Sequence, residues 1–411
     1  MMQSVDIAII GGGMVGLTFA AAFKGSDIRV AVIDGNIPEH HESPLPTGRV
    51  SALSRSSEIV LRNLSVWQKI EQLECSPYQA MEVWEQDSFA RIEFNAQKLS
   101  QPNLGYIIEN SVVQQSLLEQ VVDMPNVSLI MPAKCTNLVM GESEAWLTLD
   151  NGQSLTTKLV VGADGANSWL RKNRDIPLTH WDYGHQAITA NVRTTEPHGQ
   201  VARQIFTPQG PIAFLPLNNP YMSSIVWSVE SSRAEQLIAL NDSEFNKALT
   251  AEFDAKLGVC EVIGKRHMHP LKMRYARDFT LDRVALIGDA AHTIHPLAGQ
   301  GANLGVLDAA SLAQEIFKLW KQNEDIGARK NLRAYERWRK AEAMKMIASM
   351  QSFKDLFESN NPAKKLFRGI GMKLVGQLPG AKEEIMKRAL GLKGDLPDLA
   401  TRQVYYDEVT D

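Results

Sequence analysis

The hydrophobic and polar positions near the start of the chain predict a strand, a glycine loop, a helix and a second strand. Residues 5–10 are mostly β-branched or small and apolar, a pattern typical of a buried strand. The run stops at the sequence GGGMVG of residues 11–16, and residues 17–23 are small, apolar and compatible with a helix. Residues 29–33 predict the next strand, which ends at Asp34. Together these segments predict a βαβ unit.

The spacing of this unit matches the G-x-G-x-x-G fingerprint of dinucleotide-binding proteins. Gly11 allows the tight turn, Gly13 lets backbone N–H groups approach a pyrophosphate, and Gly16 lets the helix pack on the strand. The positive end of the helix dipole then faces the phosphates. Asp34 follows Gly16 by 18 residues and can accept hydrogen bonds from ribose hydroxyls. The alternative is a glycine-rich turn in an unrelated α/β protein.

Two later segments repeat the change from a buried strand to small and polar residues. Residues 159–161 lead into the sequence GADG, in which Asp164 either caps the next helix or lies near a cofactor. Residues 283–287 lead into Gly288 and Asp289, followed by a helix-compatible stretch. Open α/β sheets bind ligands at the carboxyl ends of their strands, so Asp289 is expected to contact a polyol.

The segment that follows combines a proline, several glycines and the start of a helix. Residues 295–308 read HPLAGQGANLGVLD, and a helix is predicted to begin near Gly301. The N-terminus of this helix is placed to stabilise negative charge on a reduced flavin ring. His292 and His295 are three residues apart, but no Cys or carboxylate set with ligand spacing accompanies them. Packing or hydrogen bonding is therefore favoured over a metal site.

These blocks resemble those of the single-component flavoprotein aromatic hydroxylases. Residues 295–308 resemble the signature of the ubiquinone-biosynthesis branch of that family. The resemblance covers nearly the whole chain, including residues 49–53 and 104–110. The stretches most similar to the 2-polyprenylphenol 6-hydroxylases of this branch are residues 81–84, 167–171, 196–198 and 361–366.

The resemblance implies a set of FAD-binding residues. Those expected to hold the adenosine half are Gly11, Gly13, Gly16 and Asp34. Those expected near the pyrophosphate, the ribitol or the flavin ring are Arg49, Asp164, Gly288, Asp289, Pro296, Gly299, Gly301 and Asn303. Many relatives carry Arg or Gln where this chain has Asn110, so one charged phosphate contact is expected to be missing.

Helical and nucleotide-binding motifs alternate along the chain with strand-rich stretches, so the domains are expected to interleave. The predicted class is α/β, with a Rossmann-like FAD-binding domain, a mainly antiparallel-sheet substrate domain and C-terminal helices. The FAD-binding domain is expected from residues 1–75, 105–179 and 277–345, the substrate domain from residues 76–104 and 180–276, and the helical segment from residues 346–411.

The resemblance also implies an oxidoreductase reaction. NADPH or NADH reduces FAD, O2 adds to give the flavin C4a-hydroperoxide, and this species hydroxylates a 2-polyprenylphenol at the position that becomes C5 of the ubiquinone ring. The flavin carries the chemistry, so no catalytic side chain is implied, and the protein supplies an apolar pocket that excludes water. With one G-x-G-x-x-G motif, NAD(P)H is expected to bind transiently. The alternatives are another ring position, or a non-catalytic FAD-binding subunit of a quinone-assembly complex.

The composition limits the compartment and the partners. The 43 Lys and Arg and 47 Asp and Glu residues give a net charge of -4, which offers no bulk attraction for nucleic acid. Three widely spaced cysteines favour free thiols in a reducing compartment. The uncharged residues 7–23 contain glycines and follow a leader without Lys or Arg, which favours a cytoplasmic protein over a secreted one.

Basic residues concentrate near the C-terminus. Residues 361–393 contain eight Lys or Arg and two Glu, a local charge of +6, and apolar residues recur between them at helical spacing. One interpretation is the solvated face of a packed helix. The other is contact with an anionic membrane surface or another ubiquinone-biosynthesis protein, because a polyprenyl tail is hardly soluble. The second would make the enzyme peripheral at the inner membrane.

Overall fold

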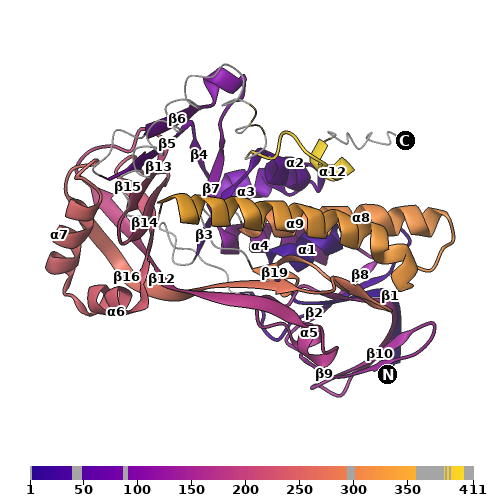
Figure 1. Cartoon of the computed structure of the whole chain (residues 1–411). Helices are drawn as coiled ribbons and strands as arrows, with labels where there is room; N and C mark the ends of the chain where they lie inside the picture. Colours follow the sequence, from indigo (N-terminus) through magenta and orange to yellow (C-terminus); the bar gives the residue numbers. More distant parts are fainter. Residues whose placement is uncertain are drawn as a thin grey trace.

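The computed structural model describes residues 2–38, 49–86, 91–293, 301–357 and 390–401, together with residues 384 and 387. Two large sheets lie at opposite ends of the molecule, and the long helices α8 and α9 run alongside them (Figure 1). Among the described residues, no helix is both long and apolar enough to cross a membrane.

The first sheet contains the predicted βαβ unit. Its parallel strands are β8 (Val127–Ile130), β2 (Val30–Ile33), β1 (Met2–Ile10), β11 (Ser154–Gly162) and β18 (Val284–Leu286), in that spatial order. The antiparallel additions are β17 (Thr280–Leu281) beside β18, β10 (Ala145–Leu149) beside β11, and β9 (Cys135–Met140) beside β10. Because the strand order leaves β1 in both directions, the carboxyl end of β1 is the expected ligand crevice.

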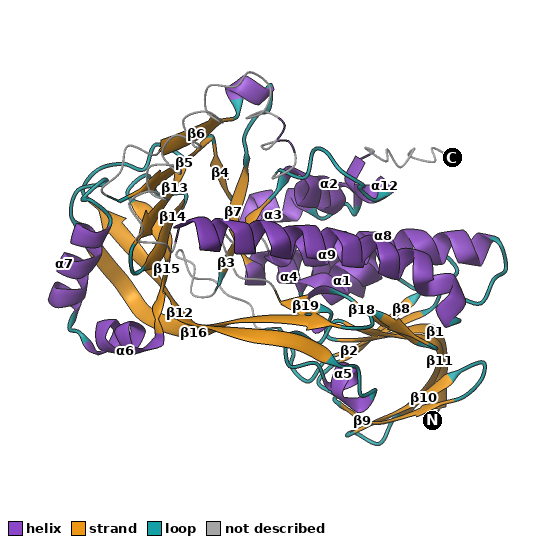
Figure 2. Cartoon of the chain, in the orientation of Figure 1, coloured by secondary structure: helices purple, strands orange, loops and turns teal. Residues whose placement is uncertain are grey.

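Helices cover one side of this sheet (Figure 2). They are α1 (Met14–Ala21), α4 (Asn110–Val122), α8 (Gly301–Lys321) and α9 (Arg329–Phe357). Nearby are α2 (Arg55–Asn63), α3 (Trp67–Leu73), α5 (Trp169–Asn173) and α12 (Asp398–Thr401). All four residues of β2 are buried, which agrees with a parallel strand covered on both faces.

The second sheet is mainly antiparallel. Its order is β19 (His292–Thr293), β16 (Cys260–Ala276), β12 (Leu178–Thr194), β15 (Met222–Glu230), β14 (Gly210–Pro216), β13 (Val201–Thr207), β5 (Ala80–Glu85) and β6 (Arg91–Asn95). Among the described strand pairs of this sheet, only β13–β5 is parallel. Helices α6 (Ser231–Ala239) and α7 (Asp242–Glu252) contribute apolar side chains to a core shared with its strands.

A small antiparallel sheet lies between the two. It consists of β3 (Val50–Leu53), β7 (Gly105–Glu109) and β4 (Ser76–Tyr78), with the 3-10 turn η1 (Gln97–Leu99) nearby in sequence. Its apolar side chains share one core with Ala202, Leu215 and Met222 of the large sheet. The two 17-residue strands β12 and β16 extend toward the nucleotide-binding sheet, where β16 pairs with β19.

The predicted fold class is confirmed, and so are the strand, loop and helix of the first βαβ unit and the helix start at Gly301. The stretch after Asp289 differs from the prediction. It forms a single 3-10 turn, η2 (Gly288–Ala290), because the next residues pair with β16 as β19. The division into domains stays a prediction, although α9 runs without a break through the boundary at 345 and 346, and β4 pairs with β7.

Candidate cofactor and substrate site

The glycine turn between β1 and α1 leaves an open cradle on one side. Gly11 has φ +112°, and a Cβ atom there would lie 2.3 Å from the Ala163 carbonyl oxygen. A Cβ atom on Gly16 would lie 2.0 Å from the Gly11 carbonyl oxygen, whereas one on Gly13 would meet no atom within 4 Å. Gly13 is also the N-cap of α1 and provides no side-chain cap. This open side, next to uncapped N–H groups, fits a pyrophosphate.

Asp34 lies directly against this turn. Its Oδ2 accepts a hydrogen bond of 2.7 Å from the Gly12 backbone N–H, and its Oδ1 accepts one of 2.8 Å from Asn36 N–H. A carboxylate has further acceptor sites, so these bonds leave capacity for a ribose hydroxyl. No sequence motif pointed to Gln114 of α4, whose Nε2 donates to the Gly12 carbonyl over 2.7 Å and holds the turn from the other side.

Asp164 combines features of both predicted roles. Its Oδ2 accepts a hydrogen bond of 3.1 Å from Leu170 N–H in α5, but the N-cap itself is Ser168, whose hydroxyl accepts from Arg171 N–H over 3.0 Å. The other oxygen, Oδ1, is buried and has no hydrogen-bond partner within the described residues. A cofactor contact by Asp164 stays a prediction, and the unpaired oxygen is compatible with it.

Asp289 and Arg49 come together from distant parts of the sequence. Asp289 lies in the η2 turn, after Gly288 with φ +59°. Burial raises the pKa of the Asp289 carboxyl above its ordinary value, while the positive charges of Arg49, His292 and Arg274 favour its ionised form. The structure therefore gathers these groups around the carboxylate that is expected to bind the ribitol.

A buried polar network that involves α8 and α9 holds the η2 turn in place. Asp308 of α8 is fully buried, and its Oδ2 accepts from Gly288 N–H over 3.0 Å and from His292 Nε2 over 2.6 Å. Its Oδ1 accepts from Arg339 Nε of α9 over 2.6 Å. Burial favours the neutral acid, but His292 and Arg339 outweigh it and lower the pKa of Asp308. His295 lies outside the described residues.

Asp308 and Arg339 were not among the predicted site residues. Asp308 is the last residue of the 295–308 motif, so the sequence could have indicated it as a site residue. Its partner Arg339 in α9 belongs to no motif, so nothing in the sequence indicated it. Gly305 was not predicted as a site residue either, and a Cβ atom there would lie 2.7 Å from Val15 Cγ2 and 3.3 Å from Gly288 Cα. The missing side chain lets α8 approach both glycine turns.

The start of α8 is tied to β3. Asn303 accepts a hydrogen bond from Ser54 N–H at Oδ1 and donates one to the Ala52 carbonyl from Nδ2, each of 2.8 Å. Both ends of this amide are therefore used within the protein, beside the expected flavin ring. Asn110 begins α4, and its Oδ1 accepts from the Ser51 hydroxyl over 2.6 Å. Pro296 and Gly299 lie outside the described residues.

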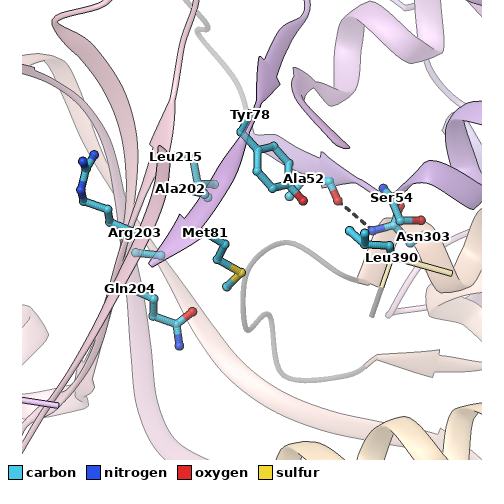
Figure 3. Close-up of a pocket in the computed structure, with 11 residues that line it drawn as sticks. Ala52, Ser54, Tyr78, Met81, Ala202, Arg203, Gln204, Leu215, Asn303 and Leu390 are labelled. Atoms are coloured by element: carbon cyan, nitrogen blue, oxygen red, sulfur yellow. Dashed lines mark hydrogen bonds between the residues drawn. The ribbon is translucent and has the colours of Figure 1, made fainter. Parts of the chain in front are cut away.

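A pocket opens between the start of α8 and the large sheet (Figure 3). Its free space is about 510 Å³, including solvent at its mouth. Ala52, Ser54, Tyr78, Asn303 and Leu390 line one side, and Met81, Ala202, Arg203, Gln204, Ala213 and Leu215 line the other. Most of these side chains are apolar, and Asn303 places the pocket beside the predicted position of the flavin.

The glycine cradle, the gathered Asp289 and the unpaired Asp164 oxygen fit FAD. A family model described as "FAD binding domain" matches residues 4–350. The chain is 34% identical over 391 residues to 3-demethoxyubiquinol 3-hydroxylase of Escherichia coli (strain K12), covering 95% of this chain and 99% of that protein. The chain belongs to the FAD-binding family of ubiquinone-biosynthesis hydroxylases. It is an FAD-dependent monooxygenase, as the resemblance implied.

Other comparisons agree with this family. The ubiquinone biosynthesis monooxygenase COQ6 of Danio rerio is 33% identical over 436 residues, covering 93% of this chain and 88% of that protein. The solved structure of p-nitrophenol 4-monooxygenase PnpA from Pseudomonas putida DLL-E4 superposes with a TM-score of 0.75 at 19% identity, covering 95% of this chain and 97% of that one. At that identity the superposition shows the fold alone. The individual role of each FAD-binding residue stays a prediction.

Proposed function

We propose that this monooxygenase hydroxylates the aromatic ring of a 2-polyprenylphenol in ubiquinone biosynthesis, at the position that becomes C5 of the quinone ring. The observation that supports this proposal most directly is the apolar pocket beside Asn303, between the expected flavin position and the large sheet. Its walls suit a ring with few polar substituents, since apolar side chains such as Met81, Leu215 and Leu390 form most of them.

FAD, once reduced by NADH or NADPH, supplies the activation of O2. The chain's own residues bind the cofactor and exclude water from the reaction site. Apolar walls exclude water, which limits loss of the activated oxygen as hydrogen peroxide. Asn303 fixes the first turn of α8 against β3 and the residue after it, which would hold the positive end of the helix dipole beside the expected flavin position. The Asp308 network holds the turn that carries Asp289.

The ring position is the finer part of the proposal. Residues 81–84 and 167–171 resemble the 2-polyprenylphenol 6-hydroxylases, which supports the C5 assignment. The relative from Escherichia coli carries the name of a 3-hydroxylase of 3-demethoxyubiquinol, and this observation favours hydroxylation at another ring position as the second candidate. A non-catalytic FAD-binding subunit is the third, and it predicts no turnover at all.

An assay of the FAD-loaded protein separates these candidates. We expect 2-polyprenylphenols with short prenyl chains to stimulate NADPH or NADH oxidation. Mass spectrometry of the product should show one oxygen atom added for each NADPH or NADH oxidised. NMR of the product then identifies the hydroxylated carbon. Product hydroxylated at a carbon other than C6 of the phenol would reject the C5 assignment and support the second candidate, which is hydroxylation at another ring position. Hydrogen peroxide without hydroxylated product, across a panel of prenylated phenols, would reject the enzymatic proposal.

A genetic experiment tests the same proposal in the cell. Deletion of the gene is expected to lower ubiquinone and to accumulate the unhydroxylated prenylphenol or a shunt product. Complementation with the wild-type gene is the control. Normal quinone in a strain without a redundant hydroxylase would contradict the proposed pathway.

A further inference from the structure

Most polar side chains around the pocket already have partners inside the protein. The Ser54 hydroxyl lies 2.9 Å from the Ser56 hydroxyl, and the Asn303 amide bonds to Ala52 of β3 and to Ser54, which directly follows that strand. The Arg203 guanidinium turns away from the pocket, where it donates to Glu82 over 3.2 Å and to the His198 carbonyl over 2.8 Å (Figure 3). The side chains of Ser54, Asn303 and Arg203 are therefore already engaged within the protein.

Gln204 is different from its neighbours. Its side chain is only 6% exposed and lines the pocket, and no hydrogen bond of its amide group is found within the described part of the chain. The strand register places it between Val83 of β5 and Ala213 of β14, both apolar. Its amide group therefore faces the pocket rather than a protein partner, where it can donate and accept hydrogen bonds to a ligand.

The amide of Gln204 also has the chemistry that a phenol requires. It offers a carbonyl acceptor and an N–H donor side by side, and a ring hydroxyl can donate to the first and accept from the second. Small side chains at Ala202 and Ala213 flank it on the pocket wall and leave room for a ring above the sheet. Figure 3 shows the Gln204 side chain on the sheet side of the pocket, opposite Asn303.

We propose that Gln204 is the positioning residue for the substrate, and that its amide binds the ring hydroxyl of the phenol and so decides which ring carbon faces the flavin. This inference rests on the proposed function, because it names the group that recognises the substrate of that same pocket. Tyr78 is the other candidate in the pocket. Its hydroxyl has no hydrogen bond within the described residues, and burial raises its pKa to about 12, so it stays neutral.

Binding measurements on two ligands test the assignment. The ligands are 2-prenylphenol and prenylbenzene, which is the same molecule without the ring hydroxyl. Their Kd values are measured with the FAD-loaded protein from the change in flavin absorbance. Gln204→Met keeps the volume of the side chain but removes its hydrogen bonds. We expect this variant to bind 2-prenylphenol about tenfold more weakly, which corresponds to about 1.4 kcal/mol, and prenylbenzene within twofold of the wild type.

Two further variants act as controls. Gln209→Met makes the same change in the exposed turn between β13 and β14, and it should alter neither Kd. Tyr78→Phe removes the other hydroxyl in the pocket and should leave the preference for the phenol intact. FAD content, measured from absorbance, shows that each variant is folded and loaded.

The outcomes separate the inference from the proposed function. Equal weakening of both ligands by Gln204→Met, or unchanged binding of the phenol, overturns the assignment. A phenol-specific loss in Tyr78→Phe but not in Gln204→Met transfers the role to Tyr78 and also overturns it. In turnover, Gln204→Met is expected to spread hydroxylation over more ring positions and to release more hydrogen peroxide. If the wild type binds the phenol but hydroxylates none of the panel, the proposed function fails while the binding comparison still decides the role of Gln204.

Discussion

Replacing Asp308 by Asn should destabilise the protein strongly, because it leaves a buried cation without a counter-charge. Arg339 is 1% exposed, and its Nε lies 2.6 Å from Asp308 Oδ1. The Asn amide keeps one acceptor oxygen but turns its N–H donors toward groups that are donors themselves. Breaking a buried ion pair on one side costs about 3–5 kcal/mol. The free energy of unfolding should fall by this amount in urea titrations at pH 7.

An exposed ion pair provides the matched control. Arg193 and Glu261 lie 3.6 Å apart and are both more than half exposed, so Glu261→Gln should cost no more than about 1 kcal/mol. If Asp308→Asn costs no more than Glu261→Gln, the buried network does not stabilise the fold in the way described.

The pH dependence of the same variant follows from the lowered pKa of Asp308. Burial raises this pKa, but His292 and Arg339 lower it by more. A depressed pKa contributes stability above the ordinary Asp value of about 3.9 and loses it as the pH falls through the folded value. The difference between wild type and Asp308→Asn should therefore be full at neutral pH and shrink below about pH 4.

A double variant separates the folding role of the network from its effect on the cofactor. Asp308→Leu combined with Arg339→Met removes both charges, and such replacements are often neutral or stabilising. The double variant should therefore be more stable than Asp308→Asn. Its affinity for FAD should stay about tenfold below wild type, because the Gly288 N–H loses its acceptor and the turn carrying Asp289 is less fixed. FAD affinity equal to wild type would show that the network does not position this turn.

Four further changes test the cofactor site and the C-terminal segment. Gly16→Ala should lower the unfolding temperature even without FAD, because its Cβ atom would lie 2.0 Å from the Gly11 carbonyl oxygen. Gly13→Ala meets no protein atom and should weaken only FAD binding. Wild-type FAD affinity in Gly13→Ala would contradict the phosphate cradle. Asp289→Ala should weaken FAD binding by about 1.5–3 kcal/mol in flavin fluorescence titrations, and unchanged retention would exclude the ribitol contact. Glu substitutions in the part of the basic C-terminal segment that lies outside the described residues should reduce binding to anionic liposomes, while FAD content and activity on a short-chain phenol persist. Equal binding across a salt titration would leave only the solvated-face interpretation. The positions for these Glu substitutions are Lys364, Lys365 and Arg368.

The sequence by itself determined the first βαβ unit and the start of α8. These features depend on neighbouring residues: a β-branched run, a glycine turn that Cβ atoms would block, and small apolar residues at helical spacing. The strand before Gly288 was predictable for the same reason, but the helix-compatible stretch after it was not helical. Residues 292 and 293 pair with β16, and that long-range pairing outweighs the local preference.

Only the tertiary structure decided which distant side chains meet. Arg339 lies on a helix with no motif of its own, yet its packing against α8 makes it the partner of Asp308. Gln204 belongs to an ordinary alternating strand, and its importance is visible only once Ala213 and Val83 are found beside it and a pocket above it. Partners and burial of this kind depend on strand order and helix packing, which local hydrophobic patterns do not encode.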